Sequence, residues 1–283
     1  MNIPSVRKAI RLADWRILSR LYSSNSKFLD VTQNEKTGVS TISLNRAPVN
    51  SLNLDILREL KESLEKLKKD GSKGLILTSS LPTVFSGGLD IMEMYKPDIK
   101  RCTEFWNTLQ DTWILLNELE IPTVAAINGA SPAGGCLLAI SCEYRIFVDG
   151  KHTIGLNETK LGIVAPFWFQ EPYIKTIGQR RAELALLRGD LFTPQQALEI
   201  GLVDELASSK EDALAKAEKY IESYRQISPR ARAMTKKSLR ESMIQNLVKN
   251  RETDTVVFIS AITNPGIQTS LGLYIESLKK KAK

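Results

Sequence analysis

Two glycine-rich turns have the residue types to hold a developing negative charge. They read FSGGLD (residues 85–90) and NGASPAGGC (residues 128–136), and each adjoins a run of apolar residues typical of a buried strand. Glycine lets backbone N–H groups point into a site without a side chain in the way, and a helix that starts just after each turn would add its positive end. One N–H group from each turn could form an oxyanion hole for a carbonyl that becomes an enolate.

A single carboxylate lies in an otherwise apolar stretch further along the chain. Glu158 belongs to GLNETKLG (residues 155–162), between a short strand-like run and Gly162. Burial would raise its pKa towards the working pH, as a base that removes a proton from carbon requires. Taken alone, each element has a plainer interpretation: glycine turns are mostly just turns, and Glu158 could sit at a helix start beside the Asn157 cap.

In this order, the motifs resemble the crotonase (enoyl-CoA hydratase/isomerase) superfamily over most of residues 28–283. The segments that carry the resemblance are FSGGLDIMEM, INGASPAGGCLLAISCEYRI and IGLNETKLGIVAPFW, of which the last is the most specific. The resemblance implies that the backbone N–H groups of Leu89 and Gly134 are the catalytic oxyanion donors and that Glu158 is the catalytic base. It also implies that the acyl-CoA substrate contacts Gly87, Gly88, Leu89, Asp90, Ile91, Gly134 and Asn157.

Leu137 separates two reactions of this superfamily. Hydratases carry a second glutamate at the matching position, because two carboxylates are needed to hold and activate a water. An isomerase that moves one proton from C2 to C4 needs one carboxylate in a dry site. The sequence therefore predicts an isomerase that converts cis- or trans-3-enoyl-CoA to trans-2-enoyl-CoA in fatty-acid β-oxidation, with a hydratase- or thioesterase-like enzyme as the alternative.

An RNA-binding member of the superfamily is a second alternative, because one branch pairs this fold with a row of lysines on a helix. The net charge of +7 is concentrated at the ends: residues 1–27 carry +5 and residues 279–283 carry +4, which leaves −2 for residues 28–278. The lysines of the helix expected at 53–70 alternate with glutamates. Charge therefore argues against nucleic acid as a partner.

Composition narrows the class of protein further. The chain is 42% hydrophobic and 25% charged, and no apolar run approaches the roughly 20 residues that cross a bilayer. Three cysteines and one histidine, His152, make a disulfide framework or a histidine-built metal centre improbable. The phosphate-binding glycine motifs of nucleotide sites are absent from the sequence. We therefore expect no metal and no redox cofactor, with CoA entering as part of the substrate, and no insertion into a membrane.

The first 27 residues have the composition of a mitochondrial transit peptide and its junction. Apolar residues recur on one narrow helical face, and basic residues outnumber the single acid, Asp14. The sequence around Arg20 resembles a matrix-processing site with cleavage after Tyr22. This predicts a mitochondrial matrix protein; the alternative is an amphipathic surface helix of the mature fold. The apolar face consists of Val6, Ile10, Ala13, Ile17 and Leu21.

Short strands and helices alternate from residue 28 onwards, which predicts an α/β core over residues 28–205 and a helical C-terminal region over residues 206–283. No strand is expected beyond about residue 176. The resemblance implies a crotonase-like spiral of ββα turns, with the C-terminal helices joining three copies into a homotrimer. Expected strands are 29–33, 39–44, 74–79, 123–128, 143–148 and 152–156; expected helices are 53–70, 101–119, 136–142, 178–188, 193–201, 210–226, 229–245, 250–261 and 265–281.

Overall fold

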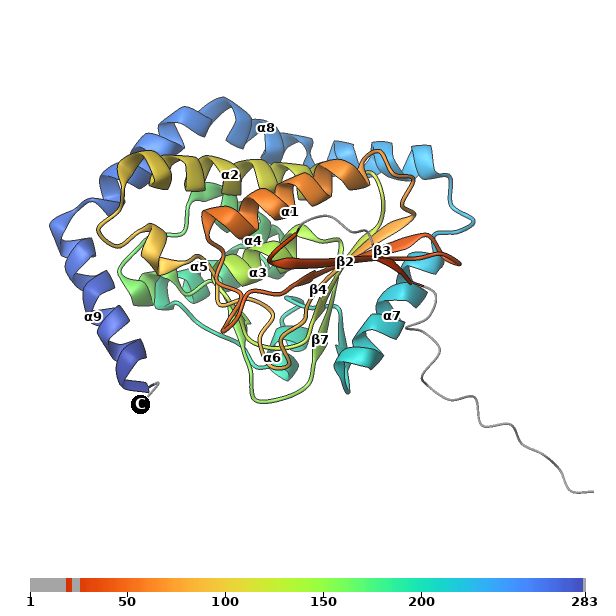
Figure 1. Ribbon diagram of the computed structural model, residues 1–283, viewed down its shortest axis with the longest axis horizontal. Coiled ribbons are helices and arrows are strands. Elements are labelled where there is room, and N and C mark those ends of the chain that lie inside the picture. The colour runs from red at the N-terminus through yellow and green to blue at the C-terminus, as the bar shows by residue number, and fades with distance from the viewer. Residues whose placement is uncertain (1–18, 22–25, 282–283) are drawn as a thin grey trace, which may run out of the picture.

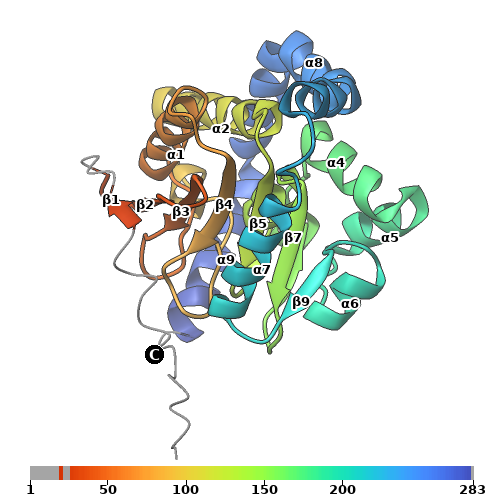
Figure 2. The ribbon, with the colours of Figure 1, turned by 90° about the vertical axis from the view of Figure 1, so that its right-hand side faces the viewer.

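The computed structural model describes residues 19–21 and 26–281. Its described strands form a seven-stranded sheet in the order β1-β2-β3-β4-β5-β7-β9, with antiparallel pairing from β1 to β3 and parallel pairing from there on. Figure 1 shows helices α1 (Leu54–Leu67) and α2 (Ile99–Glu118) above this sheet, and the strand order can be followed in Figure 2. A two-stranded parallel sheet, β6 with β8, stands apart from it. The strands are β1 (Ser19–Leu21), β2 (Leu29–Asn34), β3 (Val39–Leu44), β4 (Gly74–Ser79), β5 (Thr123–Ile127), β6 (Ser131–Pro132), β7 (Tyr144–Val148), β8 (Ile154–Gly155) and β9 (Glu205–Ala207).

Helices cover both faces of the large sheet. α1, α2 and α3 lie on the face where the main core is, and Figure 2 shows α7 lying across β5 and β7 on the other. The helices are α1 (Leu54–Leu67), α2 (Ile99–Glu118), α3 (Gly134–Ser141), α4 (Phe167–Ile177), α5 (Gln179–Arg188), α6 (Pro194–Glu199), α7 (Lys210–Glu222), α8 (Pro229–Ile262) and α9 (Pro265–Lys281), with short 3-10 helices η2 (Ile91–Glu93) and η3 (Glu158–Leu161).

Successive side chains along a strand point to opposite faces of the sheet, and this alternation gives two separate cores. In β4, Leu75 and Leu77 face the main core while Ile76 faces the smaller core under α7. α1 forms because its leucines recur every three or four residues on one buried face and the Asn53 side chain caps it by accepting from the Ile56 N–H group. The predicted hairpin of β2 and β3, strands β4, β5 and β7, and helices α1, α2 and α3 are confirmed within a few residues.

Several boundaries differ from the sequence-based expectation. β9 is a strand beyond residue 176, where none was expected, and it pairs with β7. Because β9 and α7 both pack on the large sheet, the expected boundary at residue 205 cuts through the core layer rather than between two regions. α4 was not expected, and Pro172 lies inside it.

Residues 229–262 form one continuous helix, α8, where two were expected. α8 packs against α2, and in its second half Asp254 accepts hydrogen bonds from Trp106 Nε1 and Gln110 Nε2, both at 2.8 Å. At the other end of the chain, the last three residues of the expected leader helix, Ser19–Leu21, pair with β2 as strand β1. The rest of that leader lies outside the described residues.

Among the described residues, no single helix is long and apolar enough to cross a membrane. α8 and α9 meet the length and composition of a span only as a broken pair, with a bend of 69° between them.

A buried ion cluster attaches α8 to the rest of the fold. The Glu143 carboxylate, just before β7, pairs with Arg232 and lies 2.8 Å from Lys236 Nζ. These two cations hold the pKa of Glu143 below its usual value although burial opposes them. Lys236 and the neighbouring Arg240 also donate to carbonyl groups at the ends of α2 and α3. The cluster thus places the C-terminal helices against the layer that carries the glycine turns.

We expect Glu143→Gln to lower the free energy of unfolding by about 3 kcal/mol, because it leaves two buried cations without their carboxylate. Urea unfolding followed by circular dichroism measures this. Glu118→Gln, at the exposed ion pair with Lys68, is the matched control and should change stability by less than about 1 kcal/mol. Equal losses in both variants would show that burial of the cluster does not matter.

Candidate active site

The first glycine turn presents the N–H group of Leu89. The Leu52 N–H group donates to the Gly88 carbonyl at 2.8 Å, and the Asp90 N–H group donates back to the Leu52 carbonyl at 3.0 Å. Since the N–H and C=O of a trans peptide point in opposite directions, fixing the Gly88 carbonyl towards Leu52 turns the Leu89 N–H away from it. That N–H group donates no hydrogen bond to the part of the chain that the structure describes.

The second glycine turn presents the N–H group of Gly134 in the same manner. Gly134 is the first residue of α3, and the Ala133 carbonyl in the same peptide unit accepts from the Leu137 N–H group at 3.0 Å. The Gly134 N–H group therefore points out of the helix start, where the aligned peptides of α3 make it more positive. Ala133 has φ 49° and ψ −119°, a conformation that costs a residue with a side chain about 1–3 kcal/mol.

The two turns lie in contact. A methyl group added at Gly88 would lie 3.3 Å from the Gly134 nitrogen, and one added at Gly134 would lie 3.3 Å from the Leu89 nitrogen. Side chains at either glycine would thus crowd the space in front of the amides. The arrangement has the two adjacent donors of the expected oxyanion hole.

The helices that follow the two turns differ in length. A helix does start directly after the first turn, as expected, but it is the 3-10 helix η2, a single three-residue turn, and α2 begins only at Ile99. The first amide therefore lacks an α-helix of the kind that supports the second.

The small parallel sheet joins the second turn to the carboxylate. Ser131 pairs with Ile154 and Pro132 with Gly155, and the Ala133 N–H group donates to the Gly155 carbonyl at 2.8 Å. Gly155 is closely packed, because a methyl group there would lie 2.4 Å from the Asp190 carbonyl oxygen. Three residues later, Glu158 begins η3.

Glu158 is a buried carboxylate without a partner. Its side chain is 5% exposed, and neither carboxylate oxygen has a hydrogen-bond partner among the described residues. Desolvation raises its pKa to about 7, against a small opposing effect of its own backbone N–H group. Among the residues that the structure describes, no other charged group contributes to this shift. A carboxylate with these properties is poised to exchange a proton near neutral pH.

The surroundings of Glu158 are apolar or neutral. Cys136 and Tyr173, both fully buried, are close enough for the charge of Glu158 to raise the pKa of each, after the larger effect of their own burial. The Tyr173 hydroxyl, the Ser131 hydroxyl and the Asn157 side-chain oxygen also lack partners among the described residues. Leu137 is fully buried in the main core.

The structure brings together Gly88, Leu89 and Gly134 directly, and joins them to Glu158 through the small sheet. Gly87 is held by a hydrogen bond from its N–H group to the Val49 carbonyl at 2.7 Å, and Ile91 begins η2. Asn157 immediately precedes the carboxylate. The substrate contacts expected of Gly87, Gly88, Leu89, Asp90, Ile91, Gly134 and Asn157 remain predictions.

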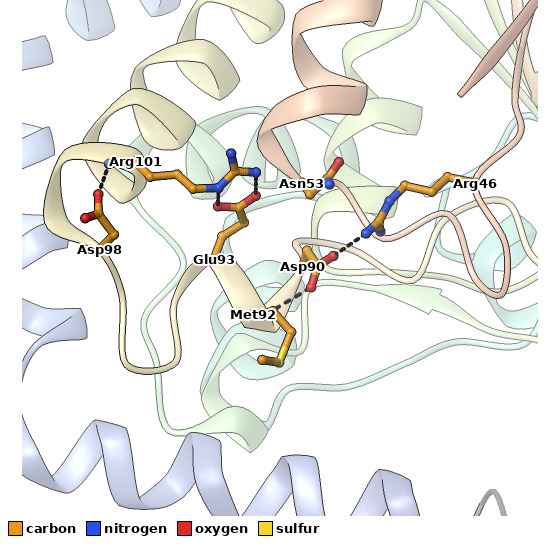
Figure 3. A pocket seen from close by; sticks show the side chains of 7 residues that line it. All are labelled: Arg46, Asn53, Asp90, Met92, Glu93, Asp98 and Arg101. Atoms are coloured by element: carbon orange, nitrogen blue, oxygen red, sulfur yellow. Dashed lines mark hydrogen bonds and ion pairs between the residues drawn. The ribbon is translucent and has the colours of Figure 1, made fainter. Parts of the chain in front are cut away.

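Asp90 differs from the other expected substrate contacts because its side chain is engaged within the protein. The carboxylate pairs with Arg46 at 2.9 Å and caps η2 by accepting from the Met92 N–H group. Figure 3 shows this pair in a cavity of about 280 Å³, opposite the pair of Arg101 and Glu93. The sequence carries no local signal for Arg46 or Leu52, since neither lies in a glycine turn and only the folded backbone brings them to one.

Within the described residues, no group of three histidine, cysteine or acidic side chains is placed to hold a metal ion.

Comparison with known proteins places this geometry in a family. The family model for enoyl-CoA hydratase/isomerase matches residues 34–283. The mouse protein named enoyl-CoA delta isomerase 1, mitochondrial, is 47% identical over 86% of this chain and 85% of its own length, and its human counterpart is 44% identical over 86% and 81%. The crystal structure of human mitochondrial delta3-delta2-enoyl-CoA isomerase superposes with a TM-score of 0.88 at 42% identity, over 91% of this chain and all of that one. The chain belongs to the enoyl-CoA hydratase/isomerase family.

Burial of an unpaired carboxylate has a measurable cost in stability. Because the folded-state pKa of Glu158 is raised, the folded protein binds more protons than the unfolded chain at pH values between the two pKa values, and its stability falls as pH rises through that window. We expect Glu158→Gln, which is neutral throughout, to be more stable than wild type by about 3 kcal/mol at pH 8 and nearly equal at pH 4.5. Thermal unfolding at both pH values measures this.

The exposed Glu62 provides the control. Glu62→Gln should show no such pH-dependent gain. If the gain of Glu158→Gln over wild type were no larger at pH 8 than at pH 4.5, the carboxylate would be solvated in solution.

Proposed function

We propose that this protein is an enoyl-CoA delta isomerase that converts cis- or trans-3-enoyl-CoA to trans-2-enoyl-CoA. The family assignment and the names of the mouse and human relatives support this reaction. The observation that carries the proposal is a solitary buried carboxylate, Glu158, joined through one small sheet to two unpartnered amides. Such a site can move one proton along a carbon chain next to a thioester carbonyl.

In the proposed reaction, the Glu158 carboxylate removes a proton from C2. The C–H electron pair forms a C1–C2 double bond, and the negative charge moves to the thioester oxygen, where the N–H groups of Leu89 and Gly134 stabilise it. The protonated Glu158 then returns its proton to C4. The C3–C4 π pair forms the new C4–H bond, the C1–C2 π pair moves to form the C2–C3 double bond, and the oxygen electrons restore the carbonyl. CoA takes part as a portion of the substrate, and the cycle uses neither metal nor redox cofactor.

Hydration is the second candidate reaction, and the site argues against it. Adding water to a double bond calls for a second carboxylate close to the first to hold and activate the water. No carboxylate in the described part of the chain shifts the pKa of Glu158, and the position at which hydratases carry that group is the buried Leu137. RNA binding is disfavoured as well, because Lys61 and Lys68 of α1 form ion pairs with Asp111 and Glu118 of α2.

The test is to incubate the protein with 3-hexenoyl-CoA and follow the ultraviolet absorbance of the conjugated product. We expect kcat/KM to rise with pH through an inflection near 7, because the base must be ionised to accept the C2 proton. Glu158→Gln should fold normally and lose at least ~10³-fold in turnover, since the amide keeps the shape but cannot carry the proton.

Two outcomes would overturn the proposal. A Glu158→Gln variant within tenfold of wild type would remove the base from the mechanism. Hydration of trans-2-hexenoyl-CoA by wild type, at a rate above that of isomerisation, would favour the hydratase alternative.

For location, we propose the mitochondrial matrix. The relatives are named mitochondrial, and residues 1–22 have the basic, amphipathic composition of a transit peptide. Cleavage after Tyr22 would remove β1, which lies at the edge of the sheet. N-terminal sequencing of the protein from the matrix fraction would give Ser23 first; the intact N-terminus would contradict the proposal.

We also propose a homotrimer built on the C-terminal helices. Large apolar side chains are exposed along them in the single chain, as an interface between copies requires. Sedimentation equilibrium would give three times the chain mass, and a monomer at micromolar concentration would argue against it. These side chains are Leu239, Val248, Val256, Val257 and Leu273.

A further inference from the structure

We propose that Arg46 is a positioning residue that orients and polarises the Leu89 N–H group through two peptide units, Ser51–Leu52 and Gly88–Leu89, the second of which carries that N–H group. The inference rests on the proposed function, in which that N–H group holds the thioester oxygen. Arg46 itself belongs to none of the glycine turns, and it acts through the loop that precedes α1.

The connection is a continuous series of hydrogen bonds. Arg46 Nη1 donates to the Ser51 carbonyl at 2.9 Å, and the N–H of that same peptide unit, on Leu52, donates to the Gly88 carbonyl at 2.8 Å. The next N–H in line belongs to Leu89. Because each peptide is planar and trans, an N–H and the C=O bonded to it point in opposite directions, so the orientation set at Ser51 is passed on to Leu89.

Arg46 is itself fixed at three points. Its backbone N–H group donates to Asn50 Oδ1 at 2.7 Å, and Nη2 pairs with Asp90 at 2.9 Å, as Figure 3 shows. Asn50 is fully buried and held by Ser79 and the Phe85 carbonyl. The guanidinium therefore ties the loop before α1 to the residue that follows Leu89, through Nη1 to the Ser51 carbonyl and Nη2 to the Asp90 carboxylate.

The charge of Arg46 compensates for the absence of an α-helix directly after the first glycine turn. Behind Gly134, the peptides of α3 align and strengthen the donor. Behind Leu89 there are two aligned peptides, and the guanidinium at their far end polarises both, since hydrogen bonds in series strengthen one another and a charged donor strengthens the first. Arg46 thus strengthens the Leu89 N–H group as a hydrogen-bond donor, as helix α3 strengthens the Gly134 N–H group.

A role for Arg46 in holding an anionic part of the substrate fits the cavity poorly. Each arginine there is already paired, Arg46 with Asp90 and Arg101 with Glu93. Asp98 adds a further carboxylate, so acidic groups outnumber basic ones around the space. This environment repels phosphate rather than binding it.

The cavity also provides a matched control. Arg46→Lys and Arg101→Lys both keep the charge and lose the forked guanidinium, but only Arg46 donates to the series that ends at Leu89. Arg46→Met removes the charge as well. We expect kcat for 3-hexenoyl-CoA to fall about tenfold or more in Arg46→Met and less in Arg46→Lys, with KM within threefold of wild type, while Arg101→Lys stays within twofold in both constants.

A second measurement tests whether Arg46 polarises the Leu89 N–H group or only keeps the surrounding loops rigid. The carbonyl stretch of bound hexanoyl-CoA, labelled with ¹³C at C1, should move to lower frequency on wild type and on Arg101→Lys, and should move clearly less on Arg46→Met. If Arg46→Met does not fold, the same carbonyl measurement is made on Arg46→Lys. A kcat within twofold of wild type in both Arg46 variants, or a lower kcat with an unchanged carbonyl frequency, would overturn the inference.

The carbonyl measurement does not depend on turnover. If wild type bound hexanoyl-CoA with a shifted carbonyl band but failed to isomerise 3-hexenoyl-CoA, the proposed reaction would fail while the role of Arg46 would still be decided by its variants.

Discussion

Two residue pairs between short parallel strands hold the site together: Ser131 with Ile154, and Pro132 with Gly155. On one side the chain continues into Ala133 and Gly134, which present an amide; on the other it continues through Leu156 to Glu158. A shift of either strand by one residue would move the amide relative to the carboxylate. Proton transfer to carbon requires such groups to be held within a fraction of an ångström, so a rigid frame of this kind is a condition of the chemistry.

Desolvation sets the pKa of the Glu158 carboxylate, and peptide geometry orients the two amide N–H groups. An unpaired carboxylate buried at Glu158 destabilises the fold but raises its pKa to about 7, as the role of base that we propose for it requires. The two amide N–H groups without partners destabilise the fold less. Each belongs to a peptide whose carbonyl already accepts a hydrogen bond, from the Leu52 N–H group in one turn and from the Leu137 N–H group in the other. Both donors are therefore oriented before any substrate arrives, which is the condition for stabilising an enolate without reorganisation.

The C-terminal helix contacts both halves of this arrangement. Gln268 of α9 accepts from the Lys96 N–H group and donates to the Met94 carbonyl, just after the first turn. Ser270, two residues on, packs against Gly162 at the end of η3, which begins with Glu158. α9 thus braces the first amide segment and the carboxylate segment from one side, so the helical region completes the site rather than standing apart from it.

The sequence by itself determined the glycine turns, the lone carboxylate and the alternation of strands and helices, because these depend on residue type and local spacing. It also excluded the second carboxylate at Leu137. It did not determine that β9 and α7 belong to the sheet layer or that α8 is continuous. The packing of α8 involves residues far away in the sequence, since its Asp254 accepts hydrogen bonds from Trp106 and Gln110, more than 140 residues earlier. Nor could it place Arg46, because a series of hydrogen bonds through Ser51, Leu52 and Gly88 exists only when two separate loops meet. Contacts between distant segments form only when the chain packs into its tertiary structure, so residue type and local spacing do not predict them.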